Sequence, residues 1–140
     1  MIKTKLGFTF VEVIIAIAIF AILVVGIFPA FLIGIKLNAI SQVSVELSNR
    51  AQATVEEIYG YSTTNTLAQT VTILTTAYSA PVVSGSTRTF TKTTTDYTFT
   101  IVLTENSPQT GMNRLTVNVI KLNNPYDVPA SQAETILLFN

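Results

Sequence analysis

One long apolar segment dominates the N-terminal part of the chain. Residues 8–35 are apolar or small apart from Thr9 and Glu12, and residues 13–35 carry no charge. A helix needs about 20 apolar residues to cross the hydrocarbon core of a bilayer, which is roughly 30 Å thick. The segment is therefore predicted to form a membrane-spanning helix. It is longer than the apolar region of a cleaved secretory signal, which has about 7–15 residues.

The helical pattern continues beyond Lys36, but only on one face. Apolar residues recur there at spacings of three and four, at Ile40, Val43, Leu47, Ala51, Val55 and Ile58. Such spacing predicts an amphipathic helix that packs its apolar face against another element. The polar stretch "YGYSTTNT" (59–66), which contains Gly60, is expected to end this helix.

Alternation with a period of two replaces the helical pattern in the rest of the chain. The segments "DYTFTIVLT" (96–104) and "RLTVNVIK" (114–121) each place apolar side chains on one face, namely Tyr97, Phe99, Ile101 and Leu103, then Leu115, Val117 and Val119. The turn "NSPQTG" (106–111) between them predicts an antiparallel hairpin. Further strands are expected at "RTFTK" (88–92) and "ETILLF" (134–139). We expect "TVTILTT" (70–76) to be a short strand or an extended connection.

These patterns together predict an α+β fold, in which a long N-terminal helix packs on a small antiparallel β-sheet of three to four strands. The amphipathic half of the helix is expected to cover the apolar face of the sheet, because so small a sheet makes only a marginal core alone. The expected organisation is a leader at 1–7, a transmembrane half of the helix at 8–35, an amphipathic half at 36–61 and a β-rich head at 62–140.

Composition narrows the chemistry that the chain can perform. Eight basic residues balance eight acidic ones over 140 residues, and the chain has no His and no Cys. Because basic residues do not outnumber acidic ones, the chain offers no net positive charge to attract nucleic acid. The missing residue types remove the commonest general base, the commonest metal ligand and any thiolate site. We therefore expect no enzymatic activity, no cofactor, no metal and no nucleic-acid partner.

The remaining acidic residues of the head give no convergent pattern. Asp96, Glu105, Asp127 and Glu134 lie near predicted turns or strand ends. We interpret them as solvated loop acids. The alternative, a cation site at the Asp127 loop, would need several converging oxygens.

Glu12 is out of place in an ordinary membrane anchor. A charge at the centre of a bilayer costs about 2.5–3.5 kcal/mol even on a lenient scale, although the cost is smaller near a helix start. The stretch "GFTFVE" (7–12), after the short leader with Lys3 and Lys5 and before the apolar helix, resembles the type IV prepilin signature. That family includes major and minor type IV pilins and the pseudopilins of secretion and competence systems.

The resemblance implies a role for several N-terminal residues. Prepilins are cut after a glycine by an inner-membrane aspartyl peptidase, and the new N-terminal aromatic residue is methylated; here these residues are Gly7 and Phe8. Glu12 is the fifth residue from Phe8, the family position that serves filament assembly. Pro29 is the twenty-second, where pilins often break the helix, and Gly26 weakens the same stretch.

The resemblance also implies partners and a location. "FVEVIIAIAIF" with "RAQATVEEIYGY" is most similar to minor pilins of the V type and pseudopilins of the I type. The implied partners are other pilin subunits, the prepilin peptidase, the inner-membrane assembly platform and, before assembly, membrane lipid. Lys3 and Lys5 before the span favour a single-pass protein with a cytoplasmic N-terminus and an extracytoplasmic head. The final location would be an extracellular pilus or a periplasmic or cell-wall pseudopilus.

Alternatives remain open at this level. We favour a minor pilin; within the family the alternatives are a pseudopilin of a type II secretion or competence system and then a major pilin, and outside it a plain signal-anchored surface binding domain. Arg50, Glu56 and Glu57 on the second half of the helix are interpreted either as a solvated face or as a subunit contact.

Overall fold

The computed structural model describes residues 7–139 of the chain. The chain divides into two units, of which the first ends at Ala39 and the second begins at Ile40. The helix α1 (Phe10–Thr64) belongs to both, and it ends inside the polar stretch predicted to end it. Of the described helices, α1 alone is long and apolar enough to cross a membrane, judged by length and composition.

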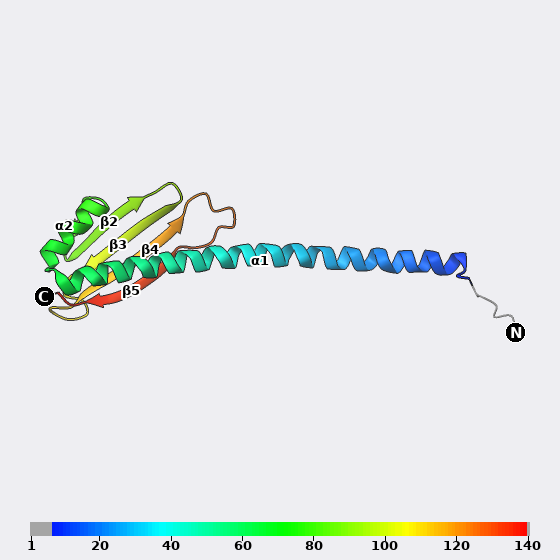
Figure 1. The fold of residues 1–140 in the computed structure, drawn as a ribbon, viewed down its shortest axis with the longest axis horizontal. Coiled ribbons are helices and arrows are strands. Elements are labelled where there is room, and N and C mark those ends of the chain that lie inside the picture. The colour runs from blue at the N-terminus through cyan, green and yellow to red at the C-terminus, as the bar shows by residue number, and fades with distance from the viewer. Residues whose placement is uncertain (1–6, 140) are drawn as a thin grey trace. The chain divides into compact units, whose positions relative to one another are not determined.

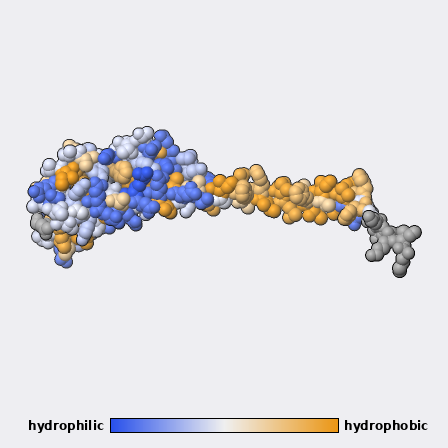
Figure 2. Space-filling model, viewed as in Figure 1, coloured by the Kyte–Doolittle hydropathy of each residue, from blue (hydrophilic) through white to orange (hydrophobic). Residues whose placement is uncertain are grey.

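The first unit consists of the apolar part of α1, and its side chains have no protein to pack against. Its large apolar residues from Val13 to Ile35 are all at least 46% exposed. On the face seen in Figure 2, hydrophobic residues cover this part of the helix. Such a surface is stable only in contact with lipid or with other apolar surfaces.

The second unit contains a five-stranded antiparallel sheet in the order β1-β2-β3-β4-β5 (Figure 1). The strands are β1 (Val82–Ser84), β2 (Thr87–Thr93), β3 (Tyr97–Thr104), β4 (Asn113–Lys121) and β5 (Ser131–Leu137). The predicted hairpin is confirmed, with Ile101 of β3 opposite Val117 of β4. The predicted count of three to four strands is too low by the short strand β1. Three residues are too few to show alternation, and the tight turn after β1 depends on Gly85 at a φ of +60°.

A second helix occupies the place where a strand or an extended connection was expected. The helix α2 runs from Leu67 to Ala77, so the prediction for residues 70–76 is wrong. Thr66 and Gln69 form a reciprocal capping box at its N-terminus. Thr70 and Leu74, one turn apart, are both fully buried. The cap and the burial outweigh the low helix propensity of the β-branched residues in this segment.

The core of the second unit lies between one face of the sheet and the two helices (Figure 1). α1 contributes Leu47, Ala51 and Ile58, and all three are fully buried, as the sequence predicts. They pack with Leu74 of α2 and with one face of the sheet, made up of Phe90, Ile101, Leu103, Leu115, Val117, Val119 and Leu137. The apolar faces predicted for β3 and β4 are therefore confirmed.

A cluster of polar contacts centred on Glu46 also joins α1 to the sheet. The hydroxyl of Tyr97 donates to the Glu46 carboxylate. Lys121 Nζ lies 3.0 Å from the same group and Arg50 Nη2 lies 3.2 Å from it. The Tyr97 hydrogen bond, followed by that of Lys121, lowers the pKa of Glu46 to about 2. The carboxylate is therefore ionised at neutral pH and connects α1 to both β3 and β4.

Candidate functional site

The start of α1 leaves the Gly7–Phe8 peptide bond open to solvent. Residues 7–9 have no regular secondary structure, and α1 begins at Phe10. Phe8 is 87% exposed and Phe10 is 80% exposed. Proteolysis concentrates at exposed terminal segments such as this, because the chain there needs no unfolding. The structure thus leaves the predicted cleavage bond free of the helix that follows it, while cleavage itself stays a prediction.

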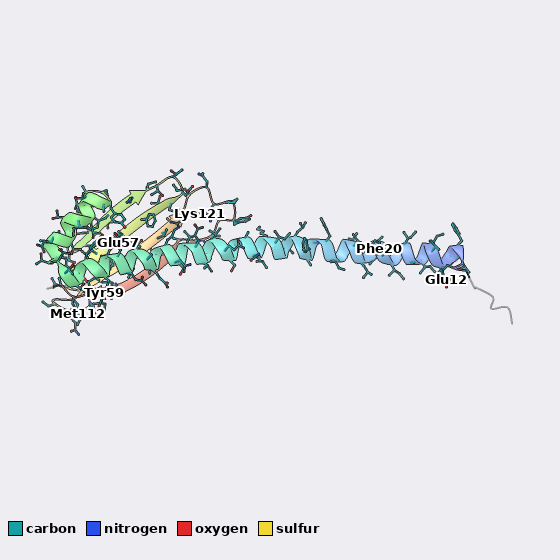
Figure 3. All side chains as sticks on the ribbon, in the orientation of Figure 1. Glu12, Phe20, Glu57, Tyr59, Met112 and Lys121 are labelled. Carbon is teal, nitrogen blue, oxygen red and sulfur yellow. The ribbon has the colours of Figure 1, made fainter. Side chains whose placement is uncertain are left out.

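Glu12 takes part in a capping box with Thr9 (Figure 3 labels Glu12). The amide and the hydroxyl of Thr9 donate to Glu12 Oε2, at 3.0 Å and 3.1 Å. In return, the Glu12 amide donates to the Thr9 hydroxyl oxygen at 3.2 Å. The carboxylate therefore satisfies one backbone donor at the helix start, the Thr9 amide, and interacts favourably with the helix dipole there.

Thr9, the partner of Glu12 in this cap, is not among the residues that the sequence analysis singles out. The signal was available, since a threonine three residues before a glutamate, followed by an apolar run, is the pattern of a capping box. The role predicted for Glu12 in assembly is separate from the cap and stays a prediction.

The helix passes through Gly26 and Pro29 without interruption in the isolated chain. A side chain at Gly26 would meet no other atom within 4 Å, so close packing does not require glycine there. The sequence predicts a kink between Gly26 and Pro29 or, in the filament, a locally unwound segment. The helix of the isolated chain is continuous there, and the local unwinding in the filament stays a prediction.

Two of the acidic residues that the sequence singled out in the head, Glu105 and Glu134, form separate ion pairs. Glu105 pairs with Arg88 at 2.8 Å, and Glu134 pairs with Arg114 at 3.4 Å. Among residues 7–139, no group of three or more His, Cys, Asp or Glu side chains is placed to hold a metal ion. The Asp127 loop thus offers no convergent acidic ligands within the described part of the chain.

The three charged helix residues singled out in the sequence have different environments. Arg50 is bound within the head, because it pairs with Glu46 and its guanidinium lies 4.0 Å from the centroid of the Tyr97 ring. Glu57 is exposed and accepts a hydrogen bond from the Tyr61 hydroxyl at 2.8 Å. Glu56 is exposed. A solvated face and a subunit contact are both compatible with the two glutamates.

Comparison with known proteins identifies the N-terminal segment. A family model described as the prokaryotic N-terminal methylation motif matches residues 2–28. This motif is the type IV prepilin signature, and the chain therefore carries that signature. A long apolar helix on a small antiparallel sheet is also a pilin-like arrangement. No curated protein and no solved structure matches the chain.

The motif and the apolar helix together fit a type IV pilin-like prepilin that is anchored in a membrane. The match ends at residue 28, within the first unit. The head therefore lies outside the segment that the family model matches.

Proposed function

We propose that the chain is a structural subunit, a minor pilin, of a type IV pilus-like filament. It enters the membrane as a prepilin, is cut after Gly7, is methylated on the amine of Phe8 and assembles through the apolar half of α1. The observation that carries the proposal is the methylation motif on a helix whose apolar side chains are exposed on every side. Such a helix can exchange lipid contacts for contacts with identical helices at little hydrophobic cost.

Topology and partners follow from the same segment. Two lysines precede the span and only Lys36 follows it directly, which favours a cytoplasmic N-terminus and an extracytoplasmic head. The leader would then face a prepilin peptidase on the cytoplasmic side. The apolar helix would be handed from membrane lipid to an assembly platform and from there to other pilin subunits.

Glu12 acquires its importance when the helix leaves the membrane interface. Cleavage after Gly7 creates a positive amine on Phe8, four residues before Glu12. Near the headgroups both charges remain hydrated, and Thr9 donates two hydrogen bonds to the Glu12 carboxylate. In a filament core that excludes water, each charge must find a partner, because an unpaired buried ion is far costlier than a buried pair. The amine of a neighbouring subunit is such a partner, and the pairing would set the axial register.

The test compares Glu12→Val with Glu12→Asp and Thr9→Val. The Val variant should still insert into the membrane, since the span becomes more apolar, but its content in sheared filaments should fall strongly. Thr9→Val removes the helix cap and keeps the charge, so it should enter filaments far better than Glu12→Val. Quantitative immunoblots of membrane and sheared-filament fractions measure both effects.

Two outcomes would count against this assignment. Wild-type incorporation of Glu12→Val along the filament shaft would remove the charge-register role. Equal losses in Glu12→Val and Thr9→Val would mean that the helix cap, and not the charge pair, is what assembly needs. The abundance of the wild-type chain in sheared filaments separates a pilin from a pseudopilin, and N-terminal sequencing of the mature chain separates both from a plain signal anchor.

A further inference from the structure

A cavity of about 310 Å³ opens on the second unit where α1, the end of α2 and the strands β2 and β3 meet. Arg50 and Glu57 of α1 line one side, and Tyr78, Lys92 and Tyr97 belong to the other elements around it. Figure 3 shows Glu57 on the part of α1 that lies nearest to α2. Small-molecule sites occupy about 300–1,000 Å³, so this cavity has room for a ligand of about one ring.

Two cations lie over aromatic rings at this cavity. The Arg50 guanidinium is 4.0 Å from the centroid of the Tyr97 ring, and Lys92 Nζ is 5.1 Å from the centroid of the Tyr78 ring. Arg50 is already neutralised by Glu46. Within residues 7–139, Lys92 forms no ion pair. A cation held over a ring at the edge of a cavity, with no carboxylate of its own, is available to a negatively charged ligand.

The opposite side of the cavity offers acceptors and hydroxyl groups. The Glu57 carboxylate is exposed and uses one oxygen to accept from Tyr61. Burial raises the pKa of Tyr78, so its hydroxyl stays protonated at neutral pH. Thr94 also lines the cavity, and its hydroxyl donates to the Tyr97 carbonyl at 3.1 Å. A ligand here would meet a cation without a carboxylate partner, a carboxylate and aromatic side chains.

We propose that this cavity binds a sugar residue that carries a single carboxylate, such as a uronic acid unit of a polysaccharide. Phe99 lines the cavity without a cation over its ring and would pack against the C–H face of the sugar. Lys92 would bind the carboxylate, and Glu57 would accept hydrogen bonds from the sugar hydroxyls. A polyanion such as nucleic acid fits poorly, because Glu57 repels further negative charge and acidic residues outnumber basic ones in residues 40–140.

The test uses the full-length protein in lipid nanodiscs and two matched probes, methyl β-glucuronide and methyl β-glucoside. They differ only in a carboxylate against a hydroxymethyl group. Titration calorimetry or ligand-observed NMR should show the glucuronide binding about tenfold more tightly, the usual worth of one charge-assisted hydrogen bond. Lys92→Gln should abolish that difference. Lys92→Met, which keeps an unbranched side chain over the Tyr78 ring, should do the same.

Controls separate this site from general effects of charge. Arg114→Gln removes a cation that pairs with Glu134 and does not line the cavity, so it should leave both affinities unchanged. Glu57→Gln should weaken both probes, because it loses a strong acceptor for hydroxyls. The proposal is overturned if neither probe binds, if both bind equally, or if Lys92→Gln and Lys92→Met, each with wild-type near-UV circular dichroism, retain the preference for glucuronide. The outcome does not depend on whether the chain forms filaments.

Discussion

At the scale of single residues, Glu46 accepts hydrogen bonds from more residues than any other described carboxylate. It accepts from Tyr97, Lys121 and Arg50, so one side chain holds α1 against two strands. Arg50 is an i,i+4 neighbour that local sequence indicates, but Tyr97 and Lys121 are 51 and 75 residues away and no local pattern predicts them. The contacts lower the pKa of Glu46 from 4.5 to about 2.

The lowered pKa predicts an acid-dependent loss of stability. A carboxyl group with a lowered folded pKa stabilises the native state fully above its unfolded pKa and loses that contribution as the pH falls towards the folded pKa. The free energy of unfolding should therefore decrease between about pH 4.5 and pH 2. Since the Glu46 side chain is 36% exposed, screening limits the loss in Glu46→Gln at pH 7 to about 1 kcal/mol.

Thermal unfolding of the full-length chain in detergent, followed by near-UV circular dichroism at several pH values, measures this effect. Glu46→Gln should unfold at a lower temperature at pH 7 and show a flatter pH profile. Glu134→Gln is the matched control, because Glu134 has a single partner at 3.4 Å and should change little. Equal profiles for wild type and Glu46→Gln would show that the cluster contributes nothing to stability.

Replacing Thr70 is predicted to stabilise the protein, whereas replacing Glu46 is predicted to destabilise it. The Thr70 side chain is fully buried in α2, and among the described residues its hydroxyl has no hydrogen-bond partner. An unsatisfied buried hydroxyl costs about 1–3 kcal/mol, and valine has the same shape without it. Thr70→Val should therefore raise the free energy of unfolding by about 1 kcal/mol. Chemical denaturation measures the change, with Thr72→Val as an exposed control; a destabilised Thr70→Val would mean that water or another partner satisfies the hydroxyl.

At the scale of elements, the two halves of α1 differ in what stabilises them. The half in the second unit is fixed by buried contacts of Leu47, Ala51 and Ile58. The half in the first unit makes no such contacts and depends on its own backbone hydrogen bonds and on its surroundings. A change of surroundings from lipid to neighbouring helices can therefore alter the local conformation of that half first.

We expect this change in the local conformation of α1 at Pro29. Pro29 has no N–H for the carbonyl of Val25, and its ring crowds the preceding turn. Neighbouring helices in a filament can satisfy the freed groups, so we predict a local break between Gly26 and Pro29 in filaments of wild-type protein. A cryo-electron microscopy map should show it, and Pro29→Ala should restore a continuous helix. Gly34→Ala, a change in the same apolar run without a proline, should leave the break in place.

Straight helix through residues 25–29 in the wild-type filament map would reject the prediction. Such a result would mean that the bilayer and the filament support the same conformation as the isolated chain, in which α1 is uninterrupted. Pro29 would then be tolerated without a role in assembly.

At the scale of the whole molecule, processing should remove the leader and nothing else. The exposed bond after Gly7 lies just before the capped start of α1, so cleavage there leaves the helix and the head intact. Intact-mass analysis of purified filaments should give a chain from Phe8 to Asn140 with one added methyl group. Gly7→Val should leave the full precursor in the membrane. A filament subunit that retains residues 1–7, or one cut within the apolar run, would contradict the prediction.

Sequence patterns alone determined the features that repeat over many residues. The apolar run at 8–35, the helical face through Leu47 and Ile58, and the alternation in β3 and β4 each reflect burial that recurs at a fixed period. The prepilin signature was likewise readable, because its residues lie close together in the chain. These features could be predicted because each depends on residues at consecutive or regularly spaced positions.

Only the tertiary structure decided the features that depend on distant partners. The segment 70–76 became helix because Thr70 and Leu74 could be buried against the sheet and α1, which outweighed its β-branched residues. The short strand β1 exists because β2 is there to pair with it. The Glu46 cluster and the cavity beside Lys92 join residues from separate elements. Burial and pairing energies of this kind arise only when the chain has folded, so no local sequence pattern predicts them.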